Sequence, residues 1–193
     1  VQEMTWDLPT QVQIGDCLLK IRNNCDYRVV LDVISAINDD DLRPEQKIEV
    51  ALKIFYDAAV LETENITENI LQSAISEMMN IINCGDAEEP VKNNKPRLMD
   101  WEQDFKWIAP PISRVLGYDV RASDKYTHWY SFIGAYMEIG DCTYNTIVSI
   151  RSKRAKGERL EKWELKFFNE HRKDVELKIK ITAEEEMLLN SQW

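Results

Sequence analysis

The stretch DYRVVLDVISAINDDDLRPEQKIEVALKIF, residues 26–55, decides the fold class of this chain. In it, apolar side chains recur every three or four residues, which is the spacing of one face of an α-helix. A first stripe comprises Tyr27, Val30, Leu31, Ile34 and Ile37, and a second comprises Ile48, Ala51, Leu52, Phe55 and Ala59. The acidic loop 38–41 separates the stripes, and Pro44 suits a first helical turn, where its missing N–H has no partner to lose. Two consecutive helices are therefore predicted.

Upstream of this stretch, the pattern becomes that of a β-hairpin. Val12 and Ile14 alternate with polar residues, Gly15-Asp16 supplies a turn, and residues 17–21 run back. Because an isolated hairpin is marginally stable in water, we expect it to pack on the helices.

Downstream, a third helix is predicted from near Thr67, with Gly85 as its C-terminal cap. Its stripe comprises Ile70, Leu71, Ala74, Ile75, Met78 and Ile82. Residues 85–97 contain two prolines and little to bury, which indicates a flexible linker.

The second half of the chain predicts four more helices. In the first of them, Asp100 and Gln103 have the spacing of a capping box, and Pro110-Pro111 are expected to kink or split the helix. Two shorter helices are expected at 129–137 and 143–157. A long, charged helix should carry Leu160, Trp163, Phe167 and His171 and continue to about Lys180.

Together these patterns predict a mainly α fold, with about seven helices in one bundle-like domain and a small N-terminal β-hairpin. The single domain spans residues 1–193, as the hairpin and helices of 1–84, the linker 85–97 and a helical half at 98–193.

Composition favours an intracellular protein. No apolar run approaches the roughly 20 residues that span a bilayer, and the first ten residues are not a secretory signal. The four cysteines are scattered, so free thiols are expected rather than a disulfide framework. Residues 1–100 hold nine Lys/Arg against nineteen Asp/Glu, so most of the surface repels phosphate.

No pattern of an active site is present. The sequence has no phosphate-binding glycine loop and no nucleophile elbow, and its two histidines lack metal-ligand spacing. His128 is expected to be packed or capping and His171 solvated, while capping and solvation account for Asp100 and Asp104. We therefore predict no catalytic, cofactor-binding or metal-binding residue, and a protein that is not an enzyme.

Partner binding is the remaining interpretation. Residues 151–180 reverse the charge balance, with eleven basic against six acidic residues, and the candidate contacts are Arg151, Lys153, Arg154 and Lys156. These cations could instead bind nucleic acid, but interleaved glutamates favour a solvated or protein-facing helix. Trp107 lies off its helix stripe, which leaves two alternatives: a second buried contact, or an exposed anchor for a partner.

Several motifs resemble a family of tailed-phage proteins named after gene product fifteen of siphophages of Gram-positive bacteria. They are DWEQD at 100–104, THWYSF at 127–132 and IVSIRS at 147–152, together with the Val-x-Ile-Gly hairpin and Asp26-Tyr27-Arg28. The resemblance runs from about residue 6 to 175.

The resemblance implies a tail assembly chaperone. Such a protein would bind the tape measure protein and tail tube subunits in the host bacterial cytoplasm, and would be absent from the mature virion. The alternative is a structural tail or connector component that stays in the virion. Neither reading involves a membrane, nucleic acid or a cofactor.

The charge split also suggests a homo-oligomer. Net charge is -10 in residues 1–100 and +5 in residues 151–180, so the acidic half of one subunit could meet the basic helix of the next. The alternative is that both faces are solvated or pair within one subunit.

Overall fold

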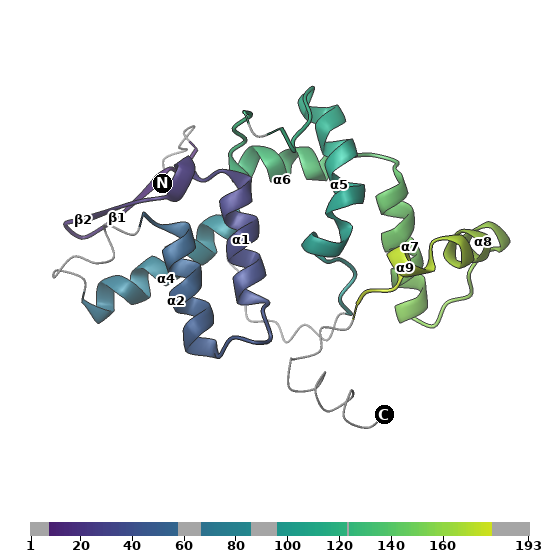
Figure 1. Ribbon diagram of the computed structural model, residues 1–193, viewed down its shortest axis with the longest axis horizontal. Coiled ribbons are helices and arrows are strands. Elements are labelled where there is room, and N and C mark those ends of the chain that lie inside the picture. The colour runs from purple at the N-terminus through teal and green to yellow at the C-terminus, as the bar shows by residue number, and fades with distance from the viewer. Residues whose placement is uncertain (1–7, 58–66, 86–95, 123, 179–193) are drawn as a thin grey trace, which may run out of the picture. The chain divides into compact units, whose positions relative to one another are not determined.

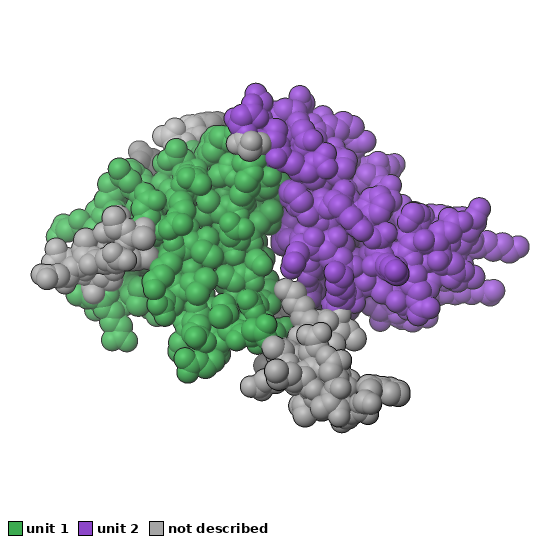
Figure 2. Space-filling model, viewed as in Figure 1, with its two compact units in different colours: residues 1–90, 126–132, 182–193 green, residues 91–125, 133–181 purple. Residues whose placement is uncertain are grey.

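The computed structural model describes residues 8–57, 67–85, 96–122 and 124–178. These residues form eight α-helices and one two-stranded antiparallel hairpin, which confirms the mainly α prediction (Figure 1). They fall into two compact units (Figure 2). Unit 1 contains residues 8–57, 67–85 and 126–132, and unit 2 contains the described residues of 96–125 and 133–178. Most of the expected linker, residues 86–95, lies outside the described residues, as does the C-terminal part of the last expected helix.

The hairpin has the predicted register. Strand β1 (Gln11–Ile14) pairs with β2 (Cys17–Lys20), and Gly15 takes a positive φ of 57° at the first position of the two-residue turn. L-residues with a side chain rarely adopt that conformation. Val12 faces Leu19 across the pair, and both side chains are buried.

Helices α1 (Tyr27–Ile37) and α2 (Pro44–Phe55) lie where the sequence predicted them. Their stripes need correction, however. Val29, Val33 and Ala36 are the buried side chains of α1 beside Tyr27 and Val30, so the inward face is rotated from the predicted one. On α2, Ile48 is exposed, whereas Leu52 and Phe55 are buried. Ala59 lies outside the described residues.

Helix α4 (Glu68–Ile82) begins where the sequence predicted, and Thr67 caps it, since the Ile70 N–H donates to Thr67 Oγ1. Two residues with a positive φ follow the helix, Cys84 at 56° and Gly85 at 83°. Gly85 is thus part of the C-terminal cap as predicted, but Cys84 precedes it in the left-handed region. The Cys84 N–H bonds to the Ile81 carbonyl and the Gly85 N–H to the Asn80 carbonyl, which together form a Schellman motif.

Helix α5 (Trp101–Leu116) runs without interruption through its two prolines. The expected split is therefore wrong. Each proline removes one backbone donor, but Pro111 is packed in the interior beside Ile108 and Ile112, and this burial favours the continuous helix.

Residues 126–132, from the second half of the sequence, belong to unit 1. The Tyr27 N–H donates to the Thr127 carbonyl and the Trp129 N–H to the Cys25 carbonyl. The Trp129 indole N–H donates to the Ile82 carbonyl at the end of α4. Phe132 stacks on Tyr27 with the ring centroids 4.3 Å apart. Helix α6 (Trp129–Met137) therefore begins in unit 1, and its residues from 133 onward belong to unit 2.

The last helical region is divided. Helix α7 (Thr143–Ala155) ends two residues before Gly157, which has a positive φ of 71°. The long helix predicted after it is two short ones, α8 (Lys162–Glu170) and α9 (Arg172–Val175). His171 leaves helical geometry between them, and from Glu176 the backbone is extended. This arrangement buries Val175 against Ile147 and Ile150. A single straight helix would not provide that contact.

Candidate partner-binding surfaces

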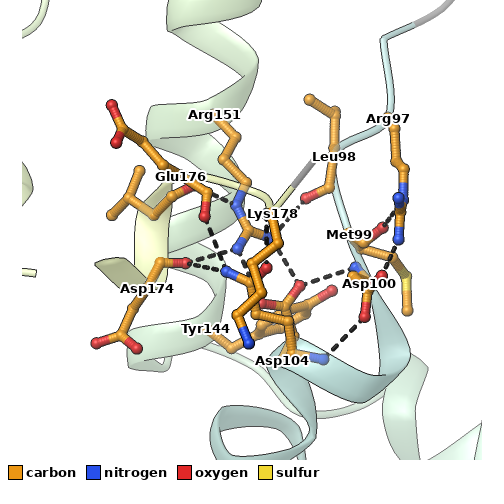
Figure 3. Close-up of polar contacts among 12 residues, drawn as sticks. Arg97, Leu98, Met99, Asp100, Asp104, Tyr144, Arg151, Asp174, Glu176 and Lys178 are labelled. Atoms are coloured by element: carbon orange, nitrogen blue, oxygen red, sulfur yellow. Dashed lines mark hydrogen bonds and ion pairs between the residues drawn. The ribbon is translucent and has the colours of Figure 1, made fainter. Parts of the chain in front are cut away.

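Arg151, the first of the predicted contacts, is a buried structural residue of unit 2. Its guanidinium binds Asp104 through two parallel bonds, Nη1 to Oδ2 at 2.6 Å and Nη2 to Oδ1 at 2.8 Å (Figure 3). Its remaining donors reach three backbone carbonyls, those of Val175, Asp174 and Leu98. All five N–H groups of the arginine thus have an acceptor. The side chain joins α7 to α5 and to the end of α9.

Asp104 was expected to be solvated, and this expectation is wrong. Its carboxylate is fully buried, and beside Arg151 it accepts the Asp100 backbone N–H at 3.0 Å. Asp100 caps α5 as predicted, because its side chain accepts the Gln103 N–H. The reciprocal bond of the capping box therefore comes from Asp104 rather than from Gln103.

The Gln103 side chain instead holds the segment that follows α9. Its amide nitrogen donates to the carbonyl of Glu176 at 2.9 Å and lies 3.4 Å from those of Lys173 and Asp174. Its oxygen accepts the Lys178 N–H at 2.9 Å. Arg151 therefore holds the end of α9, and Gln103 holds the residues that follow it.

The other three predicted cations differ in their surroundings. Lys153 binds Glu164 of α8 at 2.7 Å, and Glu164 is only 2% exposed. Arg154 lies over the Phe168 ring at 4.3 Å and reaches Glu176 at 3.4 Å. Lys156 is exposed at the end of α7. Partner binding by these residues stays a prediction, and of the four only Lys156 is both exposed and without an ion pair to a described residue.

Trp107 is half-buried on α5. It packs against the cluster of Ile147, Ile150 and Val175, and its ring meets His171 edge-on. The indole N–H is buried and has no hydrogen bond of normal geometry to a described residue.

The pKa of Asp174 is lowered mainly by its bond to Lys106 and only weakly by Trp107. His171 was expected to be solvated, but it is half-buried and its ring meets those of Trp107 and Phe167.

Helix α8 exposes a tryptophan that the sequence pattern had placed on a buried stripe. Its inward face carries Glu164, Phe167 and Phe168, so Trp163 points outward and is 58% exposed. Lys162 and Lys166 are four residues apart and share the outward face. An exposed tryptophan is a common feature of protein-binding surfaces.

A second apolar surface lies on α4 in unit 1. Leu71, Ile75 and Met79 are spaced four residues apart, so they form one stripe along the helix. Leu71 and Met79 are 37% and 36% exposed, and Ile75 is half-buried. The buried residues Ala74, Met78 and Ile81 occupy the neighbouring face. The sequence included Leu71 and Ile75 in the core stripe because spacing alone does not separate the two faces.

His128 is packed and capping, as predicted. Its Nε2 lies 3.0 Å from the Pro9 carbonyl, and its Nδ1 accepts the Tyr130 N–H at 3.1 Å. The proton of the neutral ring is therefore on Nε2. Burial lowers the pKa of His128, although the Pro9 carbonyl and Asp26 oppose this shift.

Among the described residues, no group of three His, Cys, Asp or Glu side chains could hold a metal ion. No helix in the described ranges is long and apolar enough to cross a membrane.

Comparison with known proteins confirms the family indicated by the sequence motifs. The model of the family described as Bacteriophage Gp15 protein matches residues 6–177. No curated protein and no solved structure matches the chain significantly.

Proposed function

Since the chain belongs to the Bacteriophage Gp15 protein family, we propose that it is a tail assembly chaperone that binds the tape measure protein. The family match supports a role in a phage. The more specific role comes from the sequence resemblance, which implies a protein that covers the tape measure protein until tail tube subunits replace it.

The observation that supports binding is the stripe of Leu71, Ile75 and Met79 on α4. A protein that must cover a long helical partner needs an accessible apolar surface of matching spacing, and residues at i, i+4 and i+8 pack into the grooves of another helix. Methionine suits such a surface, because its flexible side chain adapts to different neighbours. The stripe is also accessible without any rearrangement of the buried face of α4.

Co-expression with the tape measure protein tests this proposal. The chain should raise the soluble yield of the tape measure protein and be recovered with it on pull-down. The double variant L71S/M79S should abolish recovery. M137S is the matched control, because Met137 is 73% exposed but lies on α6 and belongs to unit 2.

Two results would contradict the proposal. If the tape measure protein stays insoluble with the wild-type chain and no complex forms, the chaperone function is wrong. If the complex forms equally well with L71S/M79S, the function stands, but the α4 stripe is not the binding surface.

A further inference from the structure

The surface around α8 has a positive charge that the sequence alone understates. Residues 154–173 contain seven basic and four acidic residues. One of the four, Glu164, is buried against Lys153 and adds no charge to the surface. Lys156, Arg159 and Lys162 are exposed, and none has an ion pair with a described residue. Trp163 is therefore exposed in a stretch that carries more cations than carboxylates, although Glu158, Glu161 and Glu170 are also exposed.

The end of the α1–α2 pair in unit 1 has the opposite character. Residues 39–49 contain five acidic and two basic residues. Ile48 lies on the same face of α2 as the buried Leu52 and Phe55, yet it is 43% exposed. Glu45 and Glu49, three residues before it and one residue after it, are exposed, and so is Asp40 in the loop that precedes α2. This end therefore presents one large apolar side chain among carboxylates.

We infer that the α8 surface of one molecule docks on the α1–α2 end of a second copy, with Trp163 against Ile48. The two surfaces have opposite charges of similar size, and each exposes a large apolar side chain. Trp163 and Ile48 can bury apolar area against each other, while the cations near Trp163 attract the carboxylates near Ile48. Every copy of the chain carries both complementary surfaces, so a second copy is the partner that we infer.

Such a contact joins two different surfaces, so each molecule keeps one of each kind available. Contacts of this type close into rings or extend as filaments. The inference goes beyond tape measure binding, which uses the α4 stripe, and the two can fail separately. The sequence predicted Arg151 and Lys153 as partner contacts, but both pair with carboxylates inside unit 2. The inference assigns this role to the cations of the α8 surface instead.

Sedimentation velocity with charge-swapped chains tests the inference. K162E/K166E and D40K/E45K should each sediment as a monomer. An equimolar mixture of the two should associate again, because the unchanged α8 surface of D40K/E45K meets the unchanged α1–α2 end of K162E/K166E, and the two swapped surfaces also attract each other. W163A should also lose the fast-sedimenting species. K20E/K125E, which changes the net charge of exposed residues by the same amount as K162E/K166E, should associate like the wild type. Circular dichroism of each variant checks that it is folded.

Association should weaken between about 0.1 M and about 1 M salt, where the Debye length falls from about 10 Å to about 3 Å. A wild-type protein that is monomeric at every concentration and salt overturns the inference, and this includes the case in which the two surfaces meet within one chain. An oligomer that survives both charge-swapped variants, or a mixture that does not associate again, overturns it as well.

Discussion

Arg151 and Asp104 form a two-bonded ion pair in the interior of unit 2, with side chains that are 5% and 0% exposed. They are 47 residues apart in the sequence and join α7 to α5. The same guanidinium holds the carbonyls of Asp174 and Val175. A residue that the charge pattern suggested for partner binding thus has a structural role.

Removing Arg151 should destabilise the protein strongly. R151M leaves a buried carboxylate without its cation, which costs about 3–5 kcal/mol. The double variant R151M/D104L should be more stable than R151M, because the uncompensated charge is gone. Urea unfolding monitored by circular dichroism measures both effects.

R172M is the matched control for R151M. Arg172 also pairs with a carboxylate, that of Glu176, but its side chain is 68% exposed. Exposed ion pairs contribute about 0–1 kcal/mol to the free energy of unfolding, so R172M should change the urea midpoint little. Equal destabilisation by R151M and R172M would show that burial of the Arg151 pair has no special importance.

Gln103 should control the order of the segment after α9. In Q103A, the Lys178 N–H loses its acceptor and the Glu176 carbonyl loses its donor. Hydrogen exchange of the Lys178 amide should become faster, while amides within α7 keep their protection. E102A serves as control, because Glu102 is exposed on the same turn of α5. Unchanged exchange at Lys178 in Q103A would argue against this clamp.

His128 should make stability fall in mild acid. Its pKa in the folded protein is below the ordinary value of 6.5 because it is buried, so below pH 6.5 the unfolded chain binds more protons than the folded one. The contribution of the neutral ring to the free energy of unfolding is complete above pH 6.5, and it is lost as the pH falls through the lowered pKa of His128.

The H128N variant separates this titration from the cap. An asparagine at this position can still accept the Tyr130 N–H, but it does not titrate. Urea midpoints between pH 7.5 and 5.5 should fall more for the wild type than for H128N. Parallel curves for the two proteins would exclude His128 as the source of the pH dependence.

The proposed chaperone role predicts absence from the finished particle. Quantitative mass spectrometry of purified virions should find the tape measure protein but not this chain. Presence at a fixed ratio to the tape measure protein would instead support the alternative of a structural tail or connector component.

The sequence by itself determined the local elements of the structure and the family. Turn and cap residues have short-range effects, so Gly15, Asp26, Thr67 and Asp100 mark their hairpin and helix starts correctly. Helical spacing likewise located most of the helices. These features depend on hydrogen bonds between neighbours in the chain, which a single sequence displays.

Only the tertiary structure decided which faces are buried and which charges are paired. Trp163 is exposed and Glu164 is buried, although helical spacing suggested the reverse for Trp163. Periodicity shows that a helix has an apolar face, but the helices packed against it determine which side chains are covered. Arg151 and Asp104 find each other across 47 residues because folding brings α5 and α7 together, and a buried charge is stable only beside its partner.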